Sequence, residues 1–186
     1  MLAKAVSRYY LILYIVFGFS LIDCTKKTRI DFYAEKIFIE LNQMSVRVTG
    51  EYFFENLTHT RKIVKFFYPF PVDSIHYFPD IILLDLPYDK DTNGIYFAMK
   101  MEPGKDNSFK IVYCQKLKKR HFRYITTTTR KWERPIKDAE FIIIAGKNVR
   151  LRINYDISKI ESYLDKQYYR IVKKKFFPEE DLIIEW

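Results

Sequence analysis

Residues and motifs on which much protein chemistry depends are rare or absent in this chain of 186 residues. It has two cysteines, three histidines and five glycines. Two cysteines allow at most one disulfide, which excludes the class of small domains held together by several disulfides. The sequence contains no Walker-A loop, no Gly-x-Gly-x-x-Gly motif and no Gly-x-Ser-x-Gly motif. We therefore predict a protein that is not an enzyme, with no catalytic residues and no cofactor.

Spacing argues against a metal site as well. His59, His76 and His121 lie in separate segments, whereas a zinc site in a short motif places its ligands a few residues apart. Acidic and amide residues alternate between Asp89 and Gly94, as they do at the start of a calcium loop. Position 12 of such a loop is normally glutamate, and Lys100 stands there instead. We predict a polar turn and no metal site.

Long hydrophobic runs are absent apart from one near the N-terminus. There, two basic residues precede an uncharged stretch from Tyr9 to Phe19. A run of this length matches the core of a signal peptide, about 7–15 residues, and is shorter than the roughly 20 residues of a membrane-spanning helix. We predict that residues 1–20 are a signal peptide cleaved after Ser20, and that residues 21–186 form a single exported domain. An uncleaved anchor is the alternative.

A second processing route would attach a lipid to Cys24. Leu21 to Cys24 resembles a lipobox, but Asp23 stands where glycine, alanine or serine is normal. A lipid anchor is therefore an alternative to simple cleavage, and both routes place the protein in the periplasm or at the cell surface. Without a lipid, Cys24 could pair with Cys114 in an oxidising compartment. The other interpretation of Cys114 is a small buried residue on a strand.

Basic residues outnumber acidic ones, and the net charge is +9. They are spread along the chain and are denser only at residues 116–120 and 173–175. Both clusters flank strand-like segments, where lysine protects a sheet edge from pairing with other chains. We interpret the excess as solvated surface charge, with an anionic membrane surface as an alternative partner. Export argues against nucleic acid.

Apolar and polar residues alternate in many short segments from Thr28 onward. Between Ser45 and Asn56, for example, Val46, Val48 and Tyr52 fall on one face of an extended chain. Further segments of this kind are separated by Pro, Gly, Asn and Asp residues. The pattern predicts an all-β, mainly antiparallel fold, namely a β-sandwich of roughly nine to eleven strands.

One segment departs from the strand pattern. Ser158 and Glu161 are spaced as in a helix capping box, and the apolar residues that follow share one helical face. We predict a short helix near residues 158–169. By contrast, the four threonines from Thr126 to Thr129 favour extended structure, so a strand is expected to continue through Thr127.

Gly50 to Asn56, followed by Phe67 to Val72, combines aromatic residues with closely spaced prolines. This pattern resembles a hairpin of extracellular β-sandwich modules of the vault-protein/inter-alpha-trypsin type. Tyr124 to Thr128, Trp132 to Ile136 and Phe177 to Leu182 are similar to segments of bacterial exported domains of unknown function. The resemblance implies a bacterial host, export and a β-sandwich fold, and these families carry no established catalytic residues.

Together these observations favour a non-enzymatic exported domain, namely a protein-interaction or structural component of the cell envelope with an unidentified protein partner. The alternative is a carrier of a hydrophobic or anionic ligand such as a lipid, because a sandwich with many inward aromatic residues can leave an apolar cavity. Aromatic residues make up 18% of the chain. Six of them are candidates for an interaction surface: Tyr77, Phe78, Tyr88, Trp132, Tyr168 and Tyr169.

Overall fold

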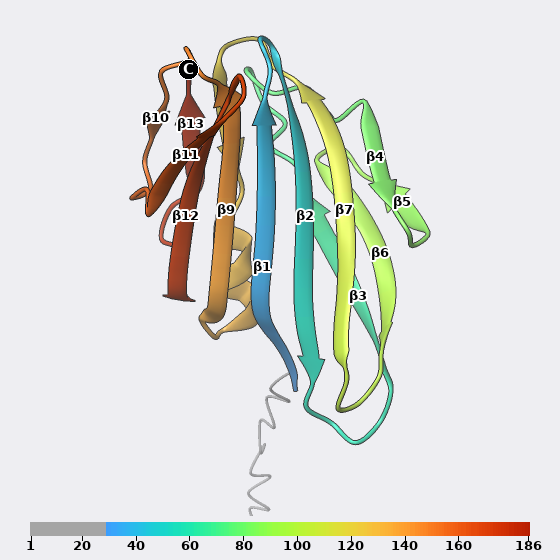
Figure 1. The fold of residues 1–186 in the computed structure, drawn as a ribbon. Coiled ribbons are helices and arrows are strands. Elements are labelled where there is room, and N and C mark those ends of the chain that lie inside the picture. The colour runs from blue at the N-terminus through green and yellow to red at the C-terminus, as the bar shows by residue number, and fades with distance from the viewer. Residues whose placement is uncertain (1–28) are drawn as a thin grey trace, which may run out of the picture.

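The computed structural model describes residues 29–186, which form two layers of β-structure (Figure 1). The elements are β1 (Ile30–Leu41), β2 (Ser45–Asn56), β3 (Lys62–Pro69), β4 (Ile81–Leu84), β5 (Tyr88–Lys90), β6 (Gly94–Met101), β7 (Asp106–Lys116), β8 (His121–Tyr124), the 3-10 helix η1 (Thr127–Trp132), β9 (Ile136–Gly146), β10 (Arg152–Ile153), β11 (Lys159–Tyr163), β12 (Lys166–Phe176) and β13 (Leu182–Glu185). The all-β, mainly antiparallel prediction is confirmed, with more strands than expected. The predicted signal peptide and Cys24 lie outside the described residues.

The first layer is a seven-stranded sheet with the order β11-β12-β9-β1-β2-β7-β4. Its neighbouring strands are antiparallel except for β1 and β9, which run parallel. The alternation expected between Ser45 and Asn56 is present on β2, where every second residue from Val46 onward is buried. This sheet therefore presents one apolar face to the second layer.

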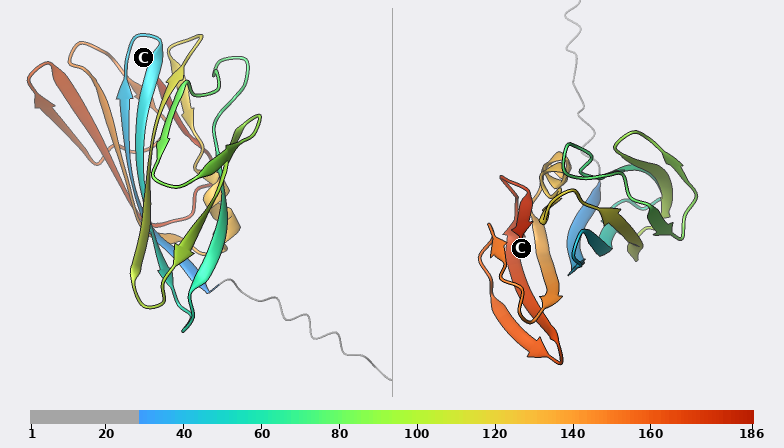
Figure 2. Two further views of the ribbon diagram at one scale, coloured as in Figure 1. Left: turned by 90° about the vertical axis from the view of Figure 1, so that its right-hand side faces the viewer. Right: turned by 90° about the horizontal axis from the view of Figure 1, so that it is seen from above.

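The second layer consists of two separate three-stranded sheets, β10-β13-β8 and β3-β6-β5. They lie behind opposite halves of the large sheet, as the view from above shows (Figure 2). Strands β3 and β8 are the outer strands of their sheets, and both face the middle of the molecule. The second layer is consequently interrupted between β3 and β8, and this interruption determines where a cavity can form.

The core between the layers is built from aliphatic and aromatic side chains. Ile37 and Ile39 on β1, Ile143 on β9 and Ile171 on β12 are completely buried. Burying each of these side chains contributes about 1.5–3 kcal/mol relative to leaving it in water. The core is therefore extensive enough to hold the wide sheet in one arrangement, even though the second layer is discontinuous.

The helix predicted near residues 158–169 is wrong. This segment forms the hairpin of β11 and β12, which pair antiparallel. The Ser158 hydroxyl accepts a hydrogen bond from the backbone N–H of Val172 across the hairpin, at 3.0 Å, instead of capping a helix. All of β11 is exposed, so an apolar helical face would have no surface to pack against. Pairing with β12 satisfies the backbone of this segment instead.

The one helical turn in residues 29–186 is η1, where the threonines led us to expect extended chain. Asp181 causes the difference. Its Oδ1 accepts hydrogen bonds from the backbone N–H groups of Thr126 and Thr127, each at 3.1 Å, and from the Thr127 hydroxyl at 2.8 Å. This carboxylate comes from more than fifty residues further along the chain, so local β-propensity gives way to a tertiary contact.

The hairpin implied by the resemblance also needs correction. Gly50 to Asn56 lies on β2 and Phe67 to Pro69 on β3, but the two strands belong to different sheets: β2 pairs with β1 and β7, and β3 pairs with β6. Cys114 lies on a strand, β7, as one interpretation had it, but it is half-buried instead of buried. Within residues 29–186, no helix is long and apolar enough to cross a membrane.

Candidate functional site

A cleft of about 1070 Å³ opens where the second layer is interrupted. Its floor is the inner face of β1, β2 and β7, one wall is the whole length of β3, and the other wall is formed by the end of β8 and by η1. The volume is just above the range that small-molecule sites commonly have, roughly 300–1000 Å³. This cleft is the strongest candidate site among the described residues.

Aromatic rings make up much of the cleft wall. Trp132, at the end of η1, lies 5.5 Å from Phe54 and 6.1 Å from Phe66 between ring centroids. Phe66 on β3 in turn meets Phe109 on β7 edge-on at 5.4 Å. Such a wall offers a ligand a large apolar contact area at low cost in side-chain entropy.

A β-bulge on β1 determines which side chains reach the cleft floor. The pairing with β2 shifts between Phe32 and Ala34, which leaves Tyr33 as an extra residue. The cleft is lined by even-numbered positions before the bulge, Ile30 and Phe32, and by the odd-numbered Glu35 after it. Bulges commonly re-aim side chains next to functional sites. Here the bulge allows an aromatic residue and a carboxyl group three positions apart to line the same cleft.

Among the described residues, Glu35 is the only acidic side chain that lines this cleft, and just 4% of it is exposed. Burial alone raises the pKa of its carboxyl group from 4.5 to about 8, so the group is mainly protonated at pH 7. Its Oε1 has no hydrogen-bond partner within residues 29–186. A buried polar group without a partner costs about 1–3 kcal/mol, which a suitable ligand would recover.

Three tyrosine hydroxyl groups lie close to one another at the same end of the cleft. The Tyr52 hydroxyl is 2.7 Å from that of Tyr68 and 2.6 Å from that of Tyr124. Burial raises the pKa of all three far above the usual value, so they stay protonated. A fourth buried tyrosine, Tyr113, lies beside Tyr68 with the ring centroids 6.2 Å apart, and its hydroxyl interacts with that of Tyr68, so the cluster extends onto β7.

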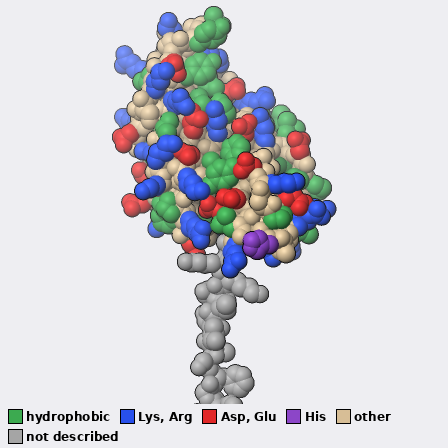
Figure 3. Space-filling model, turned by 60° about the horizontal axis from the view of Figure 1, so that its bottom comes forward, with side chains coloured by type: hydrophobic (Ala, Val, Ile, Leu, Met, Phe, Trp, Pro, Cys, Tyr) green, Lys and Arg blue, Asp and Glu red, His purple; other side chains and the backbone are tan. Residues whose placement is uncertain are grey.

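Basic side chains stand at the solvent side of the cleft. Arg29, Lys62, Lys65 and Lys131 line it and are all exposed. The cleft is thus polarised, with positive charge at its mouth and a neutral acid at its buried end. Elsewhere on this end of the molecule, lysine and arginine side chains are scattered among hydrophobic ones and form no continuous basic patch (Figure 3).

The six aromatic residues predicted from the sequence do not come together as one surface. Tyr77 is 49% exposed and lies under the ammonium group of Lys118, while Tyr169 is only 8% exposed. The remaining positions are partly buried on separate elements: Phe78 before β4, Tyr88 on β5, Trp132 on η1 and Tyr168 on β12. Of the six, Trp132 lines the cleft.

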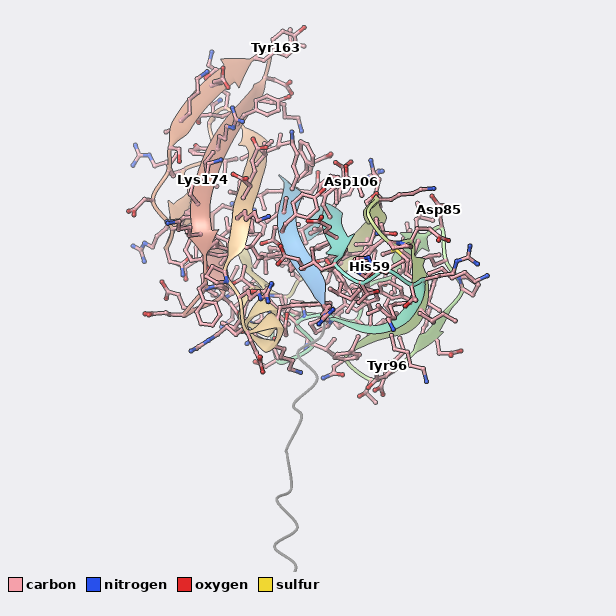
Figure 4. The ribbon with its side chains drawn as sticks, turned by 90° about the horizontal axis from the view of Figure 1, so that it is seen from below. His59, Asp85, Tyr96, Asp106, Tyr163 and Lys174 are labelled. Carbon is pink, nitrogen blue, oxygen red and sulfur yellow. The ribbon has the colours of Figure 1, made fainter. Side chains whose placement is uncertain are left out.

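Exposed apolar side chains are likewise distributed over the molecule. Tyr163, which is 67% exposed, lies at the tip of the β11–β12 hairpin, whereas Tyr96 lies on the far side of the molecule on β6 (Figure 4). Such isolated residues are normal for a protein surface. Within residues 29–186, they do not define a single docking face.

The fold brings together two histidines that are far apart in the sequence. The rings of His76 and His121 lie 5.9 Å apart. His76 Nδ1 is 2.8 Å from Asp73 Oδ1, and its Nε2 accepts the backbone N–H of Arg123 at 3.1 Å. Burial lowers the pKa of His76, although Asp73 opposes the shift. Residues 29–186 contain no group of three or more His, Cys, Asp or Glu side chains that could hold a metal ion, so this network ties a loop to β8.

Sequence reasoning missed Glu35 and the tyrosine cluster. A signal was present, because Glu35 lies two and four residues before Ile37 and Ile39 and therefore shares with them the face of β1 that points into the core. An acidic residue at a core-facing position is unusual enough to mark a functional candidate. The three tyrosines gave no comparable signal, because their meeting depends on how β2, β3 and β8 are brought together.

Comparisons with known proteins place this fold among β-rich structures. No protein-family model matches the sequence, and no curated protein matches it. A Legionella pneumophila protein proposed to bind nutrients has a similar structure, with a TM-score of 0.62 and 14% identity over 86% of this chain and 68% of its own. An M1 zinc metallopeptidase from Deinococcus radiodurans has a TM-score of 0.52 and 4% identity, over 84% of this chain.

These similarities concern the fold alone, because the identities are so low. The chain spans less than half of the metallopeptidase, which it matches over 42% of that protein's length. The comparisons support the β-rich character that the resemblance implied, but they do not extend to the vault-protein/inter-alpha-trypsin type.

Proposed function

We propose that this protein binds an elongated apolar molecule that carries an anionic group. The cleft between β3 and η1 is the observation that carries the proposal. The ligand's apolar body would lie along the aromatic wall that includes Phe66 and Trp132, and its anionic group would lie among the basic side chains at the mouth, such as Lys62 and Lys131. The proposal assigns no catalytic step to the chain.

Two further observations support a binding role over a purely structural one. Empty apolar clefts are costly, because their lining side chains forgo both packing and burial. In addition, the structurally similar Legionella protein is proposed to bind nutrients, which is compatible with a binding function on this fold. A purely structural envelope component would have no need of a cleft this large.

Titration with laurate, a carboxylate with a twelve-carbon chain, tests the proposal. Trp132 lines the cleft and Trp186, the second tryptophan, does not. We expect saturable one-to-one binding by calorimetry and a change in tryptophan fluorescence. The fluorescence change should persist in Trp186→Phe and disappear in Trp132→Phe. A change that follows Trp186 would contradict binding in the cleft.

A blocking variant provides a second test. Thr128 lines the cleft on η1, and Thr128→Trp should weaken laurate binding at least tenfold by filling the entrance. Ser162→Trp adds the same side chain to the exposed strand β11 and should bind laurate as the unmodified protein does. Equal affinity in both variants would show that laurate binds elsewhere.

We also propose that the protein acts after export, in the periplasm or at the cell surface, where it would meet envelope lipids or a protein partner. The support is the composition of residues 1–24, which resembles an export signal. The intact mass of the protein from its host tests this. A loss of twenty residues indicates cleavage after Ser20, an added diacylglycerol indicates lipidation at Cys24, and the full mass excludes both.

A further inference from the structure

We infer that the buried end of the cleft binds a protonated amine of the ligand, with the carboxylate of Glu35 as its partner. This inference rests on the proposed binding function and narrows the class of ligand. A molecule that satisfies both ends of the cleft would have an apolar body, an amino group at one end and an anionic group at the other.

Within residues 29–186, Glu35 has an unsatisfied oxygen in the cleft. Its carboxyl group is almost completely buried, lines the cleft, and has an oxygen without a hydrogen-bond partner among the described residues. Acidic residues are rarely buried unless they are paired. The basic side chains of the cleft are exposed at its mouth, so none of residues 29–186 supplies a cation at the buried end.

The groups around Glu35 also favour an amine. Tyr52 lies directly across from it on the neighbouring strand and is hydrogen-bonded to Tyr124, so hydroxyl oxygens and aromatic faces surround the same space. Ammonium groups bind well where a carboxylate combines with aromatic faces, because both attract positive charge. A ligand carboxylate would instead face an acid that must stay protonated, and would gain no ion pair.

Binding of an amine has a defined proton balance. Before binding, the Glu35 carboxyl is neutral and the free amine is an ammonium ion in water. On binding, the Glu35 carboxyl releases its proton to solvent, and the ammonium ion keeps its three protons. One carboxylate–ammonium pair forms, and one proton is released. No covalent bond in the ligand changes. Because a proton is released, affinity should rise with pH up to about the pKa of Glu35 near 8.

Three probes of equal chain length test the inference: octylamine, octanol and octanoate. Calorimetry at pH 6.5, in two buffers with different ionisation enthalpies, gives both affinity and proton release. We expect octylamine to bind at least tenfold more tightly than octanol and to release about one proton. Equal affinity of octylamine and octanol, or amine binding without proton release, would overturn the inference.

The variant Glu35→Gln assigns the effect to one side chain. It keeps the shape of the side chain but cannot become an anion, so it should lose both the preference for octylamine and the proton release while still binding octanol. Glu40→Gln, on the same strand but on the alternate face, should behave as the unmodified protein. If Glu35→Gln retains the amine preference, the inference fails although the cleft binds apolar ligands. If none of the three probes binds, the proposed function itself fails.

Discussion

At the scale of single residues, Glu35 links folding to pH. Its pKa is raised by burial from 4.5 to about 8 in the folded protein. Between these values the folded state holds a proton that the unfolded state has released. The contribution of Glu35 to stability is therefore most favourable at low pH and becomes less favourable as the pH rises through this window, by up to about 1.4 kcal/mol per pH unit.

Glu35→Gln should remove this loss of stability. We expect the variant to exceed the unmodified protein in free energy of unfolding at pH 8 by at least about 1 kcal/mol, because no buried carboxylate has to form. Urea denaturation at pH 5, 6, 7 and 8 measures the effect, with Glu40→Gln as the control on the alternate face of β1. Parallel stability curves for Glu35→Gln and the unmodified protein would contradict the assignment.

His76 has the opposite pH dependence. Burial lowers its pKa from 6.5, and its Nε2 accepts the N–H of Arg123, which only the neutral ring can do. The unfolded state therefore takes up a proton first as the pH falls. The stability that His76 contributes is complete above pH 6.5 and is lost as the pH falls below that value.

His76→Phe keeps a buried ring but removes both nitrogen atoms. We expect a loss of about 1–3 kcal/mol at pH 7.5, because the Arg123 N–H loses its acceptor. This difference in free energy of unfolding should shrink toward pH 5, because keeping the His76 ring neutral at that pH lowers the stability of the unmodified protein. Urea denaturation at the two pH values measures both quantities. His59→Phe, in an exposed loop, is the control, and a loss independent of pH would contradict the role of the ring nitrogen.

At the scale of elements, local pattern predicted strands well and their partners poorly. Alternation along β2 is a property of the segment itself, and it identified the buried face correctly. The pairing of β3 with β6 instead of β2 depends on residues beyond the turn. The same limit applies to the site. The inward position of Glu35 could be predicted from the sequence, because it follows from alternation along one strand. The helical turn η1 could not, because it depends on the distant Asp181, and the tyrosine cluster could not, because its members come from separate strands.

The β11–β12 hairpin shows why a local motif alone gave the wrong secondary structure. Ser158 and Glu161 match a capping box, but the segment contains β-branched and aromatic residues that suit a strand equally well. The turn between the strands contains Leu164, whose φ of 52° is in the left-handed region. This backbone conformation is unfavourable for leucine by about 1–2 kcal/mol, and Leu164 is 78% exposed. The turn therefore forms because β11 and β12 pair, although leucine is unfavourable in the backbone conformation of residue 164.

Leu164→Asn should stabilise the protein. Asparagine tolerates the left-handed conformation better than leucine, and little packing is lost at such an exposed position. We expect a gain of about 0.5–1 kcal/mol, measured as a shift in the urea midpoint. Ile160→Asn, on the same hairpin, is the control: it removes a similar exposed apolar side chain where no positive φ has been found, and it should not stabilise. A loss of stability in Leu164→Asn would show that the turn residue contributes through contacts instead.

At the scale of the whole molecule, stability and the candidate binding site depend on different parts of the fold. The seven-stranded sheet and its buried aliphatic residues continue across the molecule, whereas the second layer stops at β3 and β8. Strand β3 is held on one side by β6 and lines the cleft along its whole length on the other. The wall of the cleft is thus an outer strand, and outer strands open at lower free energy than the centre of a sheet.

This arrangement predicts where a bound ligand changes backbone protection. Saturating laurate should slow amide hydrogen exchange in β3 and η1, because the ligand covers both walls and stabilises the folded form by about 2.7 kcal/mol at one hundred times its dissociation constant. Strand β11 serves as the internal control, because it is an outer strand of the large sheet that does not line the cleft. Where exchange occurs by local opening of the strand, the exchange rate of β11 should not change when laurate binds. Exchange measured by mass spectrometry with and without laurate distinguishes the cases. Protection confined to β11, or equal at β11 and β3, would place the ligand outside the cleft.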